Sequence, residues 1–277
     1  MKSNFLLTAT AAVLQLGAGS AAPRFSTVFQ SHMVLQRGQL LKVWGFDAGP
    51  ATPPSISIGG GAPSLATIAE DGRWEASFPA FPASATGVDV VLMQGGAAVQ
   101  TLADVVFGDL YLFSGQSNID ISSCYAHQFN QTAMAEEAAF AEEMGRSGML
   151  RIMIVPNQVP GIHYNQHHPA AELPAVPDCP PCKPFFGPAG FNNCFCNALA
   201  WTRSTNFSAT AAGFSATAWY TGKALRAAVP ALAGVPVGLI RSSWGGTPIQ
   251  AWSSPDAVAK CPHPTPVGDS AYTYVIQ

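Results

Sequence analysis

A serine lies between two amide side chains in the segment 114–118, "SGQSN", which directly follows the apolar run "DLYLF" at 109–113. Ligands of an open parallel sheet bind outside the carboxyl ends of its strands, and this pattern puts Ser117 at such an end. Gly115 allows the backbone to turn tightly there. Position 119 is isoleucine, so the segment is not the G-x-S-x-G elbow of the α/β-hydrolases. Ser117 is therefore a candidate nucleophile, and an ordinary polar turn is the alternative.

A second strand end carries two adjacent glycines. The segment 235–252, "VPVGLIRSSWGGTPIQAW", has a strand pattern that runs into Gly245 and Gly246, and Pro248 suits the first position of a helix. Backbone amides at a strand end can stabilise the oxyanion of a tetrahedral intermediate. These glycines are candidate oxyanion donors, and a tight connection between sheet and helix is the alternative.

Serine chemistry of this kind needs a general base, usually a histidine oriented by a carboxylate. His127 follows Ser117 closely but has no obvious carboxylate partner. His263 has Lys260, not an aspartate, three residues before it. We assign the base to neither histidine.

The cysteines and the remaining histidines raise the question of a metal. Disulfides are favoured over zinc because C-x-C is a poor tetrahedral pair and exported chains favour disulfides; their connectivity stays open. The run "HYNQHH" at 163–168 offers no evident fourth ligand, so we expect no metal and no cofactor. The residues concerned are Cys124, Cys179, Cys182, Cys194, Cys196 and Cys261, and His163, His167 and His168.

The surrounding pattern changes near residue 105. Residues 23–104 show short alternating apolar runs, which predict a small antiparallel β-sandwich-like domain. From 105 to 277, strand patterns at 109–113, 149–155 and 235–240 alternate with helix patterns at 131–144 and 215–229. This order predicts an α/β domain with a parallel sheet. A stretch at about 156–205, rich in Pro, Asn, His and Cys, is expected to be an insertion.

The N-terminus and the composition indicate an exported protein. Residues 1–22 have the layout of a secretory signal peptide, and the sequons at Asn130 and Asn206 fit export. No later apolar run is long enough to span a bilayer. The formal net charge of −3 is spread along 277 residues, so we expect no nucleic-acid partner. The expected location is secreted, extracellular or lysosomal, and the oligomeric state is left open.

Four segments together resemble the sialate O-acetylesterase family of the GDSL-like (SGNH) hydrolases. They are "FQSHMVLQR", "GDLYLFSGQSN", "FSATAWYTGKAL" and "GVPVGLIRSSWGGTPIQAWSS", in the same order along the chain. The resemblance implies a three-layer, flavodoxin-like α/β hydrolase domain preceded by a small antiparallel β domain. It also implies hydrolysis of O-acetyl esters on sialic acids or related glycans, without a metal.

The same resemblance suggests roles for individual residues. Ser117 matches the nucleophile, and its amide together with that of Gly246 or Gly245 matches the oxyanion donors. Gln116 and Asn118 match the residues that shape the turn. Two further positions compare with the family: Ile119 stands where the family often has methionine, and Asp109 matches an aspartate that we interpret as structural.

In the family, the block that supplies histidine and aspartate comes after a segment like 234–254, and it is not found before Gln277. We therefore expect the SGNH domain to be incomplete here, with the His/Asp part of the site outside this chain. Whether the chain is an enzyme is left open at this stage. The alternatives to a serine esterase are a non-catalytic glycan-binding protein and an inactive fragment, and serine-directed labelling would distinguish a reactive Ser117 from an inert one.

Overall fold

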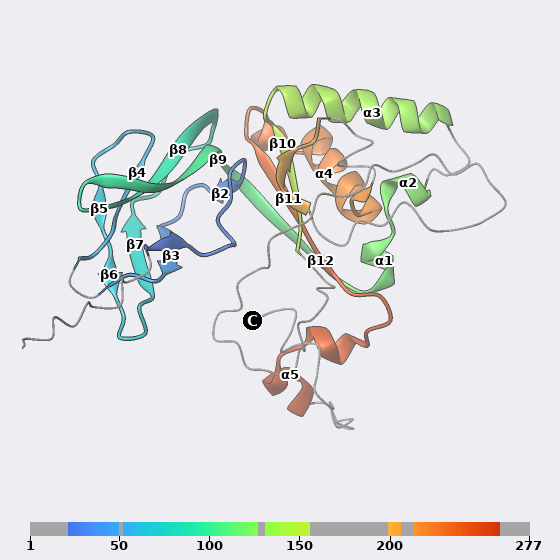
Figure 1. The fold of residues 1–277 in the computed structure, drawn as a ribbon. Coiled ribbons are helices and arrows are strands. Elements are labelled where there is room, and N and C mark those ends of the chain that lie inside the picture. The colour runs from blue at the N-terminus through green and yellow to red at the C-terminus, as the bar shows by residue number, and fades with distance from the viewer. Residues whose placement is uncertain (1–21, 50–51, 127–130, 156–198, 206–212, 261–277) are drawn as a thin grey trace, which may run out of the picture.

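The computed structural model describes residues 22–49, 52–126, 131–155, 199–205 and 213–260 (Figure 1). Several expectations fall on other residues and lie outside the described part of the chain. These are the signal peptide, most of the insertion, the sequon asparagines, five of the histidines and five of the six cysteines. Cys124 lies in helix α2, Ser123–Ala126, but its side chain is not among those described.

The N-terminal part consists mainly of antiparallel strands, as the alternating pattern predicts, while β2 pairs parallel with strand β9, Ala97–Gly115. One sheet has the order β1-β3-β7-β6, and β8, β4 and β5 continue a second sheet. The strands are β1 Arg24–Phe25, β2 Val34–Gln36, β3 Leu41–Phe46, β4 Ser55–Ile58, β5 Ser64–Leu65, β6 Thr67–Ile68, β7 Trp74–Phe78 and β8 Ser84–Gln94. Their inward-facing side chains, including Val43, Trp74, Ile56 and Leu92, belong to one buried core.

A single long strand joins this part to the rest of the chain. Strand β9, Ala97–Gly115, pairs antiparallel with β8 in its first half and parallel with β12, Val237–Ser243, in its second half. Figure 1 shows it running from the N-terminal strands to the start of helix α1. The expected domain boundary between residues 104 and 105 falls inside this strand. Both halves therefore share one eight-stranded sheet, in which seven strands have the order β11-β10-β12-β9-β8-β4-β5 and the eighth, β2, also pairs with β9.

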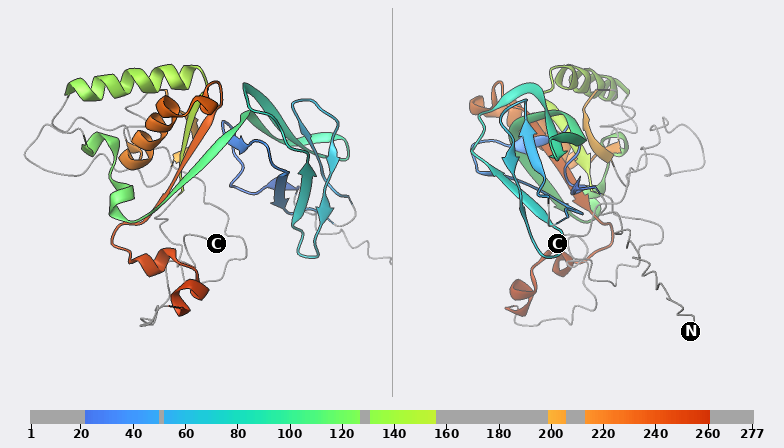
Figure 2. Two further views of the ribbon diagram at one scale, coloured as in Figure 1. Left: turned by 180° about the vertical axis from the view of Figure 1, so that it is seen from behind. Right: turned by 60° about the vertical axis from the view of Figure 1, so that its left-hand side comes forward.

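The predicted parallel strands are confirmed. Strand β10, Leu150–Ile154, pairs parallel with β12, which pairs parallel with β9, and β11, Leu199–Arg203, adds an antiparallel edge. Thus β12, the last of the three in the chain, lies between the other two. Helices α3, Gln131–Arg146, and α4, Ala216–Ala228, cover one face of this sheet (Figure 2). The remaining helical elements are α1 Ser117–Asp120, α2 Ser123–Ala126, η2 Pro230–Leu232, η3 Ile249–Trp252 and α5 Pro255–Ala259.

The two faces of this sheet have different partners among the described residues. Leu150, Ile152 and Leu239 face α3 and α4 and join Trp219 in the helix-side core. Met153 and Trp201, from the opposite face, belong to the core of the N-terminal strands. The alternation of side chains along a strand explains how one sheet serves two cores.

The end of helix α3 corrects one expectation. The sequence predicts that this helix stops before Gly145, but it continues to Arg146. A Cβ at Gly145 would come 2.3 Å from the Thr205 amide nitrogen, so the glycine allows close packing against the segment after β11. The left-handed residue that follows the helix is Gly148, with φ +71°. Gly145 therefore allows the close packing, and Gly148 provides the left-handed conformation that commonly follows the end of a helix.

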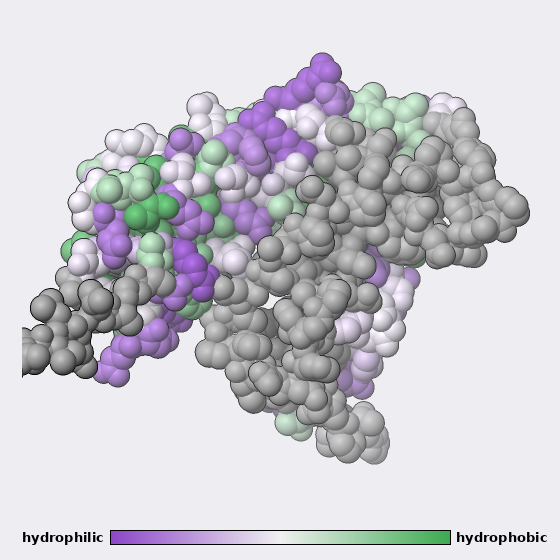
Figure 3. All heavy atoms as spheres, viewed as in Figure 1, coloured by the Kyte–Doolittle hydropathy of each residue, from purple (hydrophilic) through white to green (hydrophobic). Residues whose placement is uncertain are grey.

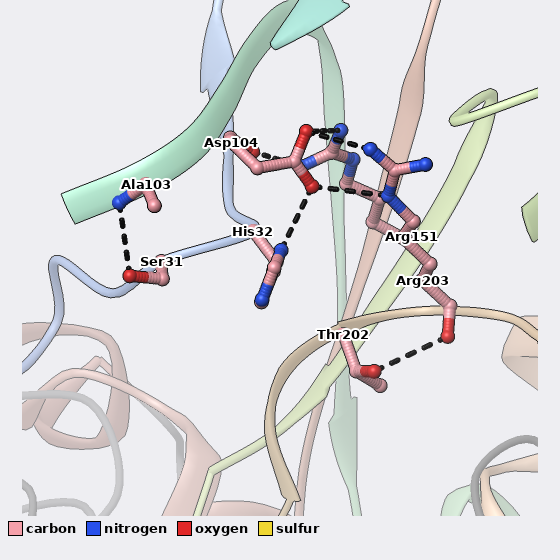
Figure 4. A network of polar contacts seen from close by, with 7 residues as sticks. All are labelled: Ser31, His32, Ala103, Asp104, Arg151, Thr202 and Arg203. Atoms are coloured by element: carbon pink, nitrogen blue, oxygen red, sulfur yellow. Dashed lines mark hydrogen bonds and ion pairs between the residues drawn. The ribbon is translucent and has the colours of Figure 1, made fainter. Parts of the chain in front are cut away.

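Asp104 contacts two arginines and a histidine where the N-terminal strands meet the parallel sheet (Figure 4). Its carboxylate accepts hydrogen bonds from Arg203 at 2.8 and 3.0 Å, from Arg151 at 3.1 Å and contacts His32 Nδ1 at 2.8 Å. The Arg151 side chain is 0% exposed. We call these four residues the junction network, and they connect β9 to β10, β11 and the loop before β2.

The surface of the N-terminal part mixes residue types. Large apolar side chains with high exposure in the described residues are Leu40, Leu65, Val99, Leu112 and Ile249. Figure 3 shows hydrophobic and hydrophilic residues side by side on the visible face of these strands.

No helix in the described part of the chain is long and apolar enough to cross a membrane.

Candidate active site

The predicted nucleophile lies where the sequence places it, at the end of a parallel strand. Strand β9 ends at Gly115, whose φ of +146° is a conformation that side-chain-bearing residues rarely adopt. Gln116 caps helix α1, and Ser117 is its first residue. The Ser117 side chain is exposed, and its Oγ donates a 2.6 Å hydrogen bond to Gln116 Oε1. The hydroxyl is therefore accessible and already oriented by its neighbour.

Helix α4 fixes the position of this turn. Thr217 Oγ1 donates to the Asn118 carbonyl oxygen at 3.0 Å, and the Ala216 amide donates to the Ile121 carbonyl oxygen at 2.7 Å. Ser215, the N-cap of α4, accepts from the Ala218 amide at 3.1 Å, so α4 itself begins at a defined residue. Asn118 contacts α4 through its main-chain oxygen, and its role in shaping the turn stays a prediction.

The second strand end lies directly beside Ser117. Strands β9 and β12 are paired up to Gly115 and Ser243, and the Trp244 amide donates to the Gly115 carbonyl oxygen at 2.9 Å. A Cβ built on Gly245 would lie 3.7 Å from Ser117 Oγ. Gly246 follows with φ +81°. The structure therefore brings Ser117 and Gly245 together, although 127 residues separate them in the sequence.

The backbone amides at this place are available for a ligand. Within the described residues, the amides of Ser117, Gly245 and Gly246 donate no hydrogen bond. Amides left without partners near an accessible hydroxyl are what an oxyanion site requires.

A carboxylate and a buried cation lie behind the serine, and the sequence analysis did not single them out. Asp120 Oδ1 accepts from Ser243 Oγ at 2.8 Å and lies 3.2 Å from Arg241 Nη2. Arg241 is 1% exposed, and burial lowers the pKa of its guanidinium while the charge of Asp120 acts to raise it. The sequence held a signal for this pair, because an arginine inside the apolar strand "VGLIRSS" needs an anionic partner.

His32, the histidine within the described residues, does not lie near Ser117. Residues 22–49, 52–126, 131–155, 199–205 and 213–260 contain one histidine, His32, which is paired with Asp104. Asp104 precedes the end of β9 by 11 residues, a length of roughly 36 Å along an extended strand. The other histidines lie outside the described residues: His127, His163, His167, His168 and His263. The four closely spaced cysteines between 179 and 196 also lie outside them. The described residues contain no group of His, Cys, Asp or Glu that could hold a metal.

Asp109, interpreted as structural from the sequence, forms a two-point ion pair with Arg37. The Arg37 Nε and Nη2 atoms lie 2.9 Å from the two carboxylate oxygens, and Gln36 donates a third hydrogen bond at 3.2 Å. These contacts hold β2 against β9, six residues before the strand ends at Gly115.

Comparison with curated proteins gives consistent matches. The chain is 27% identical to the sialate O-acetylesterases of Pongo abelii and Homo sapiens, in each case over 86% of its own length and 40% of theirs. These matches support a similarity to the sialate O-acetylesterase family over most of this chain. The rat sialate O-acetylesterase matches equally, at 27% identity over 86% of this chain and 39% of the relative. The chain thus spans about two fifths of the length of these sialate O-acetylesterases.

A solved structure has a fold similar to that of this chain. A carbohydrate acetylesterase from Xanthomonas citri superposes with a TM-score of 0.60 and 24% sequence identity, covering 86% of this chain and 44% of the other. No protein-family profile matches the chain.

Proposed function

We propose that this protein is a serine esterase that removes O-acetyl groups from sialic acids or related glycans through an acyl-Ser117 intermediate. The observation that carries the proposal is the placement of Ser117 Oγ 3.7 Å from the Cβ position of Gly245. An accessible hydroxyl thereby faces a turn with unused amides. The sialate O-acetylesterases and the carbohydrate acetylesterase among the relatives support acetylated sugars as the substrate class. The corresponding fold is a flavodoxin-like SGNH hydrolase domain with a preceding β domain.

The chemistry follows from the arrangement of the two strand ends. Ser117 Oγ attacks the acetyl carbonyl carbon, and the carbonyl oxygen takes the negative charge. The amides of Ser117 and of Gly246 or Gly245 stabilise that oxyanion. The bond between the acetyl carbon and the sugar oxygen then breaks, and that oxygen takes the proton that Ser117 gave to the base. Water attacks the acetyl-Ser117 ester, which releases acetate and returns a proton to Ser117 Oγ. The Ser117–Gln116 hydrogen bond holds the hydroxyl before substrate binds and is exchanged when a base takes the proton.

The general base of this mechanism is proposed to lie outside the described residues. His32 is engaged by Asp104 far along β9, and the other histidines of the chain lie outside the described ranges. The signal-like segment 1–22 supports the further proposal that the esterase acts outside the cell or in lysosomes.

Covalent labelling tests the assignment of Ser117. A fluorophosphonate probe is expected to modify Ser117 and not Ser114, an exposed serine three residues earlier in strand β9. Peptide mapping by mass spectrometry identifies the modified residue, and release of acetate from an O-acetylated sialic acid measures turnover. A protein that binds the acetylated sugar but neither reacts with the probe nor releases acetate would instead be a non-catalytic glycan-binding protein.

The two glycines of the turn allow steric and conformational effects to be separated. Gly245→Ala is expected to lower kcat by roughly tenfold, or ~1.4 kcal/mol, because the new methyl group lies 3.7 Å from both Ser117 Oγ and Asp120 Oδ2. That distance is an ordinary van der Waals contact, so the free energy of unfolding should change by less than about 0.5 kcal/mol.

Gly246→Ala provides the matched comparison for this measurement. Its Cβ meets nothing within 4 Å in the described residues, but φ +81° disfavours a side chain by about 1–2 kcal/mol. We therefore expect Gly246→Ala to reduce thermal stability and Gly245→Ala to reduce turnover. Equal losses of stability in the two variants would contradict the steric explanation.

A further inference from the structure

Asp120 lies on the same side of helix α1 as the nucleophile. It follows Ser117 by three residues, which places the two side chains one above the other on a helical turn. The Cβ position of Gly245 is 3.7 Å from Ser117 Oγ and 3.7 Å from Asp120 Oδ2. The hydroxyl and the carboxylate oxygen thus border the same small space beside the glycine turn.

Strand β12 holds the other oxygen of this carboxylate. Ser243 Oγ donates to Asp120 Oδ1 at 2.8 Å, and Arg241 Nη2 lies 3.2 Å from the same atom. Arg241 and Ser243 are 1% and 2% exposed. They follow Leu239 at intervals of two residues and so lie on the same, helix-side face of the strand. Both contacts use Oδ1, so Oδ2 is the oxygen that borders Gly245 and Ser117.

The cluster of Asp120, Arg241 and Ser243 therefore connects the two elements of the proposed site. Asp120 ends the helix that carries Ser117, while Ser243 is followed after one residue by Gly245. The main-chain hydrogen bond from Trp244 to Gly115 joins the same two segments at 2.9 Å. Arg241 also neutralises the carboxylate, which would otherwise oppose the negative charge that develops on the substrate oxygen.

We propose that Asp120 is a positioning residue of this site: through Ser243 and Arg241 it fixes the separation between Ser117 and the Gly245–Gly246 turn. The inference rests on the proposed function, because the positioned groups are the nucleophile and the oxyanion donors of that reaction. A displacement of about 1 Å between such groups can cost on the order of 100-fold in rate.

Conservative variants test this role in the full chain. Asp120→Asn keeps the shape but removes the charge that faces Arg241, and is expected to lower kcat for an O-acetylated sialic acid by about 100-fold with KM changed less than about twofold. Ser243→Ala removes one contact and leaves the charges in place, so a smaller loss of kcat is expected. Hydrogen exchange should become faster in segments 113–121 and 242–248 of the Asp120→Asn protein.

Asp109→Asn is the matched control. Asp109 and Asp120 have similar side-chain exposure, 19% and 21%, and each is paired with an arginine. Asp109 contacts neither strand end, so its variant should lose stability while kcat and exchange in the two segments remain as in the wild type.

The outcomes separate this inference from the proposed function. If Asp120→Asn loses stability but keeps its kcat and its exchange rates, the positioning role is overturned while the esterase stands. If the wild type shows neither turnover nor labelling, the proposed function fails and the catalytic part of this inference fails with it. Faster exchange in the two segments of the Asp120→Asn protein would then still show that Asp120 holds them together, and unchanged exchange would overturn that as well.

Discussion

Replacing Ser117 with alanine is expected to lower kcat for an O-acetylated sialic acid by a factor on the order of 10⁴–10⁶. Without the hydroxyl there is no acceptor for the acetyl group, and only substrate binding and the amides of the glycine turn remain to assist attack by water. KM should change little, because the lost interaction belongs to the reaction step. Acetate release measured over a range of substrate concentrations gives both constants.

Stability measurements exclude an indirect cause of that loss. Ser117 is exposed and its one described side-chain hydrogen bond goes to the adjacent Gln116, so the variant should unfold within about 0.5 kcal/mol of the wild type. Ser114→Ala, three residues earlier, should retain full turnover. A Ser117→Ala protein with activity within tenfold of the wild type would show that another residue forms the acyl intermediate.

Replacing Asp104 with asparagine is expected to lower the free energy of unfolding by about 3 kcal/mol. The change leaves Arg151, whose side chain is 0% exposed, without its carboxylate, and it also removes the charge that binds Arg203 and His32 (Figure 4). Asparagine tolerates the positive φ of 56° at this position, so the variant isolates the loss of charge. Urea unfolding at pH 7 measures the difference.

Glu75→Gln is the control for this substitution. Glu75 is paired with Lys42 at 2.8 Å on the surface of β3 and β7, with side chains 40% and 54% exposed. Exposed pairs contribute less than about 1 kcal/mol because water and salt screen them. If the two variants were destabilised equally, the junction network would contribute no more than a surface pair.

The stability contributed by Asp104 should also depend on pH. Burial acts to raise the pKa of its carboxyl, but the hydrogen bonds from Arg203 and His32 and the charge of Arg151 outweigh it and hold that pKa well below the usual value. A depressed pKa gives stability that is present above about pH 4 and is lost as the pH falls toward the folded-state pKa. The difference between wild type and Asp104→Asn should therefore shrink from pH 5 to pH 2. A difference that stays constant over this range would contradict the assignment.

Local patterns predicted the elements around the site closely. Helix α4 was expected at 215–229 and is found at Ala216–Ala228, because Ser215 and Pro230 are strong local signals for its two ends. Strand β10 was expected at 149–155 and is found at Leu150–Ile154, buried along its whole length. The helix end near Gly145 was predicted less well, since the contact with Thr205 that requires that glycine is not local.

The sequence by itself determined that a serine and a pair of glycines each follow an apolar strand, because strand and turn signals depend on neighbouring residues. It did not determine that β12 lies beside β9, or that one strand runs through both parts of the chain. Nor did it pair Asp120 with Ser243, which lies 123 residues further along the chain. Only the tertiary structure decided these points, since the pairing of parallel strands and the neutralisation of a buried arginine join residues that no local pattern connects.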